Sequence, residues 1–267
     1  MPAPQGFARV LEGALLATAI ALAAWRARSL SASGAVAACC VGTAAIAGGW
    51  AFGTMLIAYF VISSVLSRVG RAGKEARSGG VIEKGGARDA VQVAANGGIF
   101  AACALLSLSG GASWPLAAAG ALAAATADTW ATEIGMLSRG APRSALTWRP
   151  VPPGTSGGMS AGGTLAMIAG ASFIALLSRS LGLSAAPPVL AAGVAGALVD
   201  TVLGATFQEQ RFCDACERST ERRIHDCGAA TRQAGGMRWL RNDAVNFAAS
   251  ATGAITAATL GLLLTGH

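Results

Sequence analysis

Apolar residues run in long, nearly unbroken stretches along the chain, and short polar segments separate them. Eight of these stretches approach the ~20 mostly apolar residues that a helix needs to cross a bilayer. They cover residues 8–25, 33–49, 50–67, 90–109, 115–137, 160–178, 187–207 and 244–265. The pattern predicts an all-α, polytopic transmembrane helical bundle of about eight spans. We expect residues 1–267 to form a single integral membrane domain.

Two boundaries of this pattern need comment. Only Gly48-Gly49 separates the second span from the third, which predicts a tight hairpin there. The first span could pass for a signal peptide, with Arg9 before it. Glu12 lies inside it, however, and no clear cleavage site leads into a soluble domain, so we expect a span.

Composition agrees with a membrane bundle. The chain is 53% hydrophobic and only 12% charged, whereas a soluble domain carries about 25% charged residues. Its 36 glycines and many alanines are typical of membrane helices that pack through small residues.

The basic residues predict how the chain is oriented. All of the 20 Lys and Arg residues except Arg9 and Arg179 fall in loops 26–32, 68–89, 138–159 and 208–243. These loops alternate with loops that carry almost no basic residues, and the positive-inside rule places the basic loops in the cytoplasm. We therefore expect a multi-pass protein of the inner (cytoplasmic) membrane, with a cytoplasmic active site and both termini outside. The net charge of +7 then reports topology and contact with membrane lipids, and argues against a nucleic-acid partner.

Two of the predicted spans share a short pattern. The fifth contains AGALAAATADTWATE and the seventh AGVAGALVDTVLGATFQE, so Asp-Thr follows an Ala/Gly-rich run in both. The pattern has two readings: an internal repeat of related helices, or coincidence in an alanine-rich chain.

Carboxylates and amides inside predicted spans mark a candidate site, because such groups are costly in a membrane. At ~100° per residue they form narrow polar stripes on four helices. The stripes contain Asp128, Thr129, Thr132 and Glu133; Asp89 and Asn96; Asp200 and Thr201; and Asn242, Asp243 and Asn246. Acids of this kind suit Mg²⁺, which prefers oxygen ligands and bridges to phosphates. Pairing that fixes helix packing, or ion translocation, would explain the same residues.

The loops after these helices carry residues suited to phosphate. Loop 138–159 contains Arg149, Pro152 and the run Gly154-Thr155-Ser156-Gly157-Gly158 ahead of a helix, where backbone N–H groups can meet an anion. It is not a Walker A loop, because the Gly-Lys-Ser/Thr ending is missing. In loop 68–89 we assign Lys84 and Arg88 to the site and the other basic residues to topology.

Loop 208–243 contains four candidate metal ligands within fifteen residues: Cys213, Cys216, His225 and Cys227. A Cys₃His set binds structural zinc tetrahedrally. Disulfides are the alternative, but the predicted cytoplasmic position argues against them. We therefore predict a small cytoplasmic zinc knot in residues 208–243.

Several motifs together carry a family resemblance. DTWATEIG, PVPPGTSGGMS, GARDAVQVAANGG, DTVLGATFQ, the Cys/His loop and GMRWLRNDAVNF resemble the transmembrane protein 19 / phytyl-phosphate kinase family from about residue 30 to the end. Ser156 stands where Asn is expected, which should keep the turn. The resemblance implies Mg²⁺-dependent transfer of a phosphoryl group from a nucleoside triphosphate, with CTP favoured, to an isoprenoid monophosphate.

On this hypothesis Asp128, Glu133 and Asp200 hold Mg²⁺, and Asp89 is a further catalytic acid. Positioning and electrostatics dominate phosphoryl transfer, so these residues and the basic loops suffice in principle. Two rivals use the same parts: a CTP-dependent cytidylyltransferase of a lipid phosphate, and an ion-coupled membrane transporter.

Overall fold

The computed structural model describes residues 3–79, 81 and 86–265. Its helices are α1 (Ala3–Arg26), α2 (Ala32–Gly48), α3 (Trp50–Arg68), α4 (Arg71–Ser78), α5 (Ala90–Leu106), η1 (Ser107–Ser109), α6 (Ser113–Gly135), α7 (Ala161–Ser180), α8 (Ala186–Thr206) and α9 (Asn242–Thr265). In this part of the chain, each of the eight predicted spans corresponds to a helix whose ends lie within five residues of the prediction. The prediction of a polytopic helical bundle is confirmed.

Length and composition single out six of these helices as able to cross a membrane, within the described residues. Their apolar segments are Gly6–Arg26, Trp50–Arg68, Ala90–Ser109, Ala161–Ser180, Ala186–Thr206 and Asn242–Leu264. The helix α2 is apolar but has 17 residues, and α6 carries Asp128 and Glu133 near its end. These two helices therefore differ from the other predicted spans in length or in polarity.

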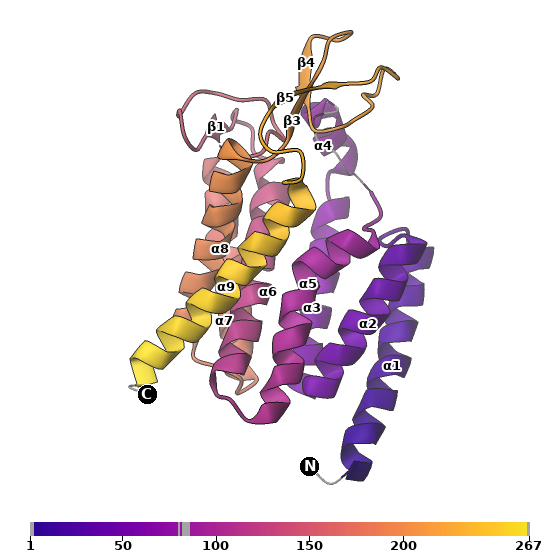
Figure 1. Ribbon diagram of the computed structural model, residues 1–267, viewed down its shortest axis with the longest axis vertical. Helices are drawn as coiled ribbons and strands as arrows, with labels where there is room; N and C mark the ends of the chain where they lie inside the picture. Colours follow the sequence, from indigo (N-terminus) through magenta and orange to yellow (C-terminus); the bar gives the residue numbers. More distant parts are fainter. Residues whose placement is uncertain (1–2, 80, 82–85, 266–267) are drawn as a thin grey trace.

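The long helices run alternately up and down, and the longer loops, with the short strands, gather at one end (Figure 1). Both marked termini lie at the opposite end of the bundle, below α1 and α9 (Figure 1). Arg68 donates a hydrogen bond to the carbonyl of Ala27 at 2.8 Å, and the Glu221 amide donates to Val81 at 2.8 Å. We call this end, which holds loops 26–32, 68–89, 138–159 and 208–243, the loop end.

The helix α6 forms the centre of the bundle. Every residue from Ala117 to Ala127 is buried. A Cβ atom added to Gly120 would lie 2.3 Å from the carbonyl oxygen of Gly253 in α9, and one added to Gly196 in α8 would lie 2.4 Å from the Cβ of Ala124. Small residues thus let α8 and α9 pack closely on α6, as is common in membrane bundles.

The predicted hairpin between the second and third spans is present. Gly49 lies between α2 and α3 with φ of +155°, and its amide donates to the carbonyls of Ala45 and Ile46. Gly48 packs against the backbone of α5, since an added Cβ would lie 2.3 Å from the carbonyl oxygen of Ala104. Both positions therefore need glycine.

Short strands add to the predicted all-α architecture in two loops. Strands β1 (Arg143–Ser144) and β2 (Gly158–Met159) pair antiparallel, and β3 (Gln210–Cys213), β4 (Arg218–Thr220) and β5 (Arg232–Gly235) form a sheet in the order β4-β3-β5. Sequence periodicity did not predict these strands, because they have two to four residues and are largely polar. The two ends of the loop that carries the larger sheet are joined by a hydrogen bond from the Glu209 amide to the carbonyl of Leu240 at 2.8 Å.

Candidate functional site

A polar cavity of about 1060 Å³ lies at the loop end. Side chains from α3, α4, α5, α6 and α9 line it, together with residues that follow β4. The structure brings eight of the predicted site residues to its wall: Arg88, Asp89, Asp128, Thr129, Thr132, Glu133, Asn242 and Asn246. The other predicted site residues that the structure describes do not line this cavity. Lys84 lies outside the described residues.

Two acids meet where α6 packs against α8. The side chains of Asp128 and Asp200 lie within hydrogen-bonding reach of each other. Oδ2 of Asp200 is buried and has no hydrogen-bond partner among the described residues. Because adjacent carboxylates repel each other, this arrangement favours a cation or a shared proton between them. The Asp-Thr echo in the sequence therefore corresponds to a contact in space.

Glu221 is a third acid near this pair, and the sequence analysis missed it. It lies in the segment after β4, lines the cavity and accepts a short hydrogen bond from the hydroxyl of Ser156. It lies near enough to Asp200 for the two negative charges to repel each other. Burial raises the pKa of Glu221 to about 7, although the hydrogen bonds from Ser156 act in the opposite direction. In the sequence nothing separates Glu221 from the other charged residues of ERSTERR.

Glu133 points toward α4 and is already paired. Oε2 lies 2.6 Å from Nζ of Lys74, and Oε1 accepts a hydrogen bond from Ser67. Lys74 is buried and also donates to the carbonyl of Leu66 at 2.6 Å. Both oxygens of Glu133 thus have partners. Lys74, whose charge was assigned above to topology, also connects α4 to α6.

The helix α4 also fixes the end of α6. Nη1 of Arg77 donates to the carbonyl of Met136 at 3.0 Å and to that of Ser138. Carbonyls at a helix C-terminus lack intrahelical partners, and a guanidinium there is favourable. This contact holds the polar end of α6 beside the basic residues of loop 68–89.

Basic side chains supply most of the charge at the rim of the cavity. Arg68, Arg71, Arg88 and Arg222 all line it. Some of their charge is balanced locally, because Arg71 lies 2.7 Å from Glu75 and Arg222 contacts Asp226. Arg88 donates to the hydroxyl of Ser67 at 3.3 Å. Guanidinium groups around a cavity with acids at its base suit a phosphate that arrives with a cation.

Several predicted residues have contacts that stabilise their own helices. Asp89 caps α5: its Oδ1 accepts from the Gln92 amide at 2.9 Å, and the Gln92 side chain accepts from the Asp89 amide at 3.1 Å. This is a capping box. Asn96, Thr129 and Thr201 each donate to the carbonyl four residues earlier. A catalytic role for Asp89 stays a prediction.

The predicted phosphate loop packs against α8. Gly157 has φ of +74°, and an added Cβ would lie 2.3 Å from the Cβ of Ala205. The Gly157 carbonyl accepts from the Ala145 amide at 2.9 Å. Within the described residues, the cavity lining contains none of Arg149, Pro152, Gly154, Thr155, Ser156, Gly157 and Gly158. The loop is connected to the cavity by Ser156, whose hydroxyl donates a hydrogen bond to the cavity-lining Glu221.

The start of α9 divides its polar residues between two faces. Asn242 and Asn246 line the polar cavity. Asp243 lies in the first turn and lines a separate, largely apolar groove with Trp239 and Phe247. An acid in the first turn of a helix is stabilised by the helix dipole. The structure therefore places the two asparagines, rather than Asp243, on the wall of the cavity that Asp128 also lines.

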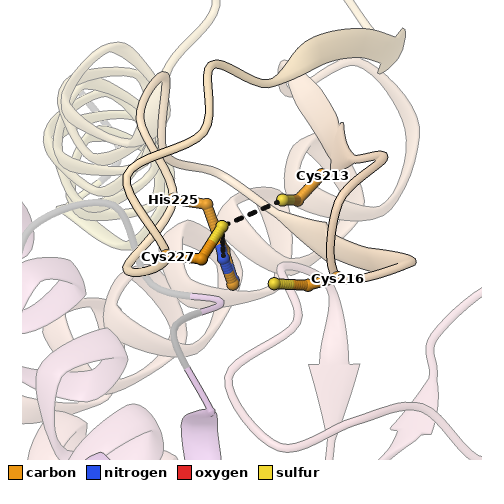
Figure 2. Close-up of side chains that lie close together, drawn as sticks. All are labelled: Cys213, Cys216, His225 and Cys227. Carbon is orange, nitrogen blue, oxygen red and sulfur yellow. Dashed lines mark hydrogen bonds between the residues drawn. The ribbon is translucent and has the colours of Figure 1, made fainter.

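The Cys/His residues of loop 208–243 come together at the end of β3. Figure 2 shows that Cys213, Cys216, His225 and Cys227 point toward one another, and their ligand atoms all lie within 4.8 Å. Sγ of Cys213 lies 3.6 Å from Sγ of Cys227, and Nδ1 of His225 lies 3.3 Å from that sulfur. The first distance is far longer than the ~2.05 Å of a disulfide. These residues could hold a metal ion.

The bundle of apolar helices with a polar site at one end defines a polytopic integral membrane protein. Comparison with known proteins gives the family: residues 15–254 match the model described as Integral membrane protein DUF92. The chain belongs to this family, and the resemblance to the transmembrane protein 19 / phytyl-phosphate kinase family is confirmed.

Three relatives show how widely the similarity extends. Protein PGR of Arabidopsis thaliana is 30% identical over 90% of this chain and 91% of its own length. Protein VTE6, chloroplastic, of the same plant is 32% identical over 85% of this chain and 64% of its own length. Uncharacterized membrane protein MJ0933 of Methanocaldococcus jannaschii is 34% identical over 61% of this chain and 67% of its own length. No solved structure gives a significant match.

Proposed function

We propose that this protein is an integral membrane kinase that transfers a phosphoryl group from a nucleoside triphosphate to an isoprenoid monophosphate, giving the diphosphate. The observation that carries the proposal is the meeting of Asp128 and Asp200 beside a cavity rimmed by arginines. Membership of the family and the similarity to the chloroplastic relative support it. CTP is the favoured donor because the family resemblance implies it.

The acids fit a magnesium ion. Asp128 and Asp200 offer hard oxygen donors, and one oxygen of Asp200 is buried without a hydrogen-bond partner among the described residues. Mg²⁺ binds through one or two carboxylates and substrate phosphates. When bound, it would neutralise charge on the β- and γ-phosphates. Glu133 is left out of this set because Lys74 and Ser67 occupy its oxygens.

The basic residues would position the two phosphates. Arg88 and Arg71 line the same cavity as Asp128, and their forked donors suit phosphate oxygens. The acceptor is itself an ionised phosphate monoester, so no strong general base is needed. Alignment of the acceptor oxygen with the γ-phosphorus, together with neutralisation of the phosphate charges, would supply most of the rate enhancement.

We further propose that Cys213, Cys216, His225 and Cys227 hold a structural zinc ion. A tetrahedral site with Zn–S bonds of ~2.3 Å places its sulfurs ~3.8 Å apart, close to the 3.6 Å between Cys213 and Cys227. Four protein ligands leave no position for a substrate. The ion would fix the segment that carries Glu221 over the cavity.

The concentration of Lys and Arg in the loops of one end supports a cytoplasmic position for that end. With the loop end in the cytoplasm of a bacterial-type inner membrane, the basic loops obey the positive-inside rule and the cavity faces the nucleotide pool. Both termini would then lie on the outer side.

Product analysis tests the proposal and separates it from its rivals. Purified protein is incubated with geranylgeranyl or phytyl monophosphate, Mg²⁺ and labelled CTP. A kinase yields the prenyl diphosphate and CDP, whereas a cytidylyltransferase yields a CDP-lipid and pyrophosphate. Nucleotide-independent flux in proteoliposomes, driven by a proton or sodium gradient and without either product, would identify a transporter instead.

A further inference from the structure

A second cavity, of about 90 Å³, lies between α1, α2, α3 and α5. Its walls are aliphatic or aromatic over most of their length, with Ile20, Val41 and Phe60 among them. Apart from Tyr59, the polar side chains on it are Arg88, just before α5, and Gln92 and Asn96 in the part of α5 nearest the loop end. A single water needs about 10–15 Å³ in this measure. The space is therefore several waters in volume, but its walls are apolar and favour a hydrocarbon.

The cavity runs deep into the bundle. It begins at Leu30, just before α2, and reaches Ile46 near the other end of that helix. Along α2 this distance is about 20 Å at 1.5 Å per residue, which is about two thirds of the ~30 Å hydrocarbon core of a bilayer. Its shape thus suits an extended chain better than a compact headgroup.

The two cavities share part of their walls. Arg88 and Gln92 line both the apolar cavity and the polar cavity. A molecule with a phosphate at one end and an apolar chain at the other could place its phosphate at Arg88, beside the site of Asp128, with the chain between α2 and α3.

The far end of the apolar cavity is narrow. A Cβ atom added to Gly53 in α3 would lie 2.5 Å from Cγ1 of Ile46, so α3 and α2 are in close contact there. Ile46 is fully buried. Gly42 lets α1 pack closely on α2, because an added Cβ would lie 2.9 Å from the Cβ of Ala17, so these two helices close the wall between them.

From these observations we infer that the cavity between α1, α2, α3 and α5 binds the isoprenoid chain of the acceptor, with Arg88 at its mouth and Ile46 and Gly53 at its closed end. This inference rests on the proposed kinase function and adds the location of the lipid chain. It makes Val41 and Ala38, which line the middle of the channel, specificity-determining residues for chain length.

A matched pair of valines on α2 provides the test. Val41 lines the cavity, whereas Val36 is 68% exposed on the outside of the bundle. Val41→Phe and Val36→Phe add the same volume to the same helix. Binding of geranylgeranyl monophosphate by the detergent-solubilised protein is measured by native mass spectrometry, and turnover is measured with geranylgeranyl and dimethylallyl monophosphate.

We expect Val41→Phe to weaken binding of the long-chain substrate by about tenfold or more, because the added ring fills an apolar pocket. Val36→Phe should bind like the wild type, and dimethylallyl monophosphate should be turned over equally by both variants. If Val41→Phe does not fold, Ala38→Leu, which fills the same wall without adding an aromatic ring, takes its place.

The outcomes separate this inference from the proposed function. Equal long-chain binding by the Val41 and Val36 variants would overturn the inference even if the protein is a kinase. Wild-type binding without diphosphate formation, and with the loss confined to Val41→Phe, would support the chain site and overturn the kinase proposal. A wild-type protein that binds no geranylgeranyl monophosphate would overturn the chain site.

Discussion

The carboxyl groups of Asp128 and Asp200 adjoin each other across the interface of α6 and α8. Close packing through small residues brings them together, since Gly196 leaves room for Ala124 one turn before the acids. Two acids in contact within a helical bundle are expensive unless a cation or proton lies between them. Their position beside a basic cavity supports the proposed functional site.

The first prediction concerns binding of Mg²⁺ with nucleotide. At a ligand concentration of about 100 times the Kd, binding stabilises the folded protein by about 2.7 kcal/mol. Mg²⁺ and CTP together should raise the melting temperature of the wild type and of Glu133→Gln, each compared with its own ligand-free form. They should leave Asp128→Asn and Asp200→Asn unchanged.

Glu12→Gln is the matched control for this measurement, because Glu12 lies on the exposed surface of α1 and far along the chain from both acids. It should respond to Mg²⁺ and CTP as the wild type does. If Asp200→Asn responds normally, or if Glu133→Gln loses the response, the proposed assignment of the metal to Asp128 and Asp200 is wrong.

The second prediction concerns the contact between Lys74 and Glu133. Removing one partner of a buried ion pair leaves an uncompensated charge and costs about 3–5 kcal/mol. With side-chain exposures of 9% and 20% for Lys74 and Glu133, we expect a loss of stability near the lower end, about 3 kcal/mol, for either Lys74→Met or Glu133→Gln. The double variant should recover part of the loss in thermal or denaturant unfolding. Additive losses would mean that the two side chains do not interact.

The third prediction concerns the Cys/His cluster. Metal analysis of protein purified without chelator should give about one zinc per chain. Cys213→Ser should lose the zinc and make loop 208–243 sensitive to proteolysis, because metal binding and local folding are coupled. Cys40→Ser changes an exposed cysteine of α2 and should keep the zinc content. A metal-free wild type with oxidised cysteines would contradict the assignment.

The fourth prediction concerns pH. Burial raises the pKa of Glu221 from 4.5 to about 7. Between these values the folded protein retains a proton that the unfolded chain has lost, so the contribution of Glu221 to stability falls as pH rises and levels off above about pH 7. The melting temperature of the wild type should therefore fall more between about pH 5 and about pH 8 than that of Glu221→Gln. Parallel curves for the two proteins would show that Glu221 titrates normally.

Much of this structure could be predicted from the sequence. Long apolar stretches identified the eight long helices, because burial in lipid and the need to satisfy the backbone leave few alternatives. The polar stripes and the basic loops pointed to the end of the bundle where Asp128 lies. The four residues of the Cys/His cluster were also predicted to come together, because their chemistry is distinctive and they lie close in sequence.

Contacts between distant segments were not predictable. Glu133 was predicted to be a metal ligand because it shares a helix with Asp128, but α4 brings Lys74 against it. The catalytic role predicted for Asp89 stays a prediction, while the Asp-x-x-Gln pattern at this position forms a capping box. Glu221 joins the site only through the folding of loop 208–243 and its bond to Ser156, which no local pattern encodes.

The most direct test of the account is transfer of labelled γ-phosphate from CTP to geranylgeranyl monophosphate by the purified protein in the presence of Mg²⁺. The wild type and Glu12→Gln should form labelled geranylgeranyl diphosphate. Asp128→Asn and Asp200→Asn, if folded, should be slower by about 10²-fold or more, since electrostatic groups at the reacting phosphates supply most of the rate. Absence of labelled diphosphate from the wild type with every nucleotide and chain length, or full activity in Asp200→Asn, would contradict the account.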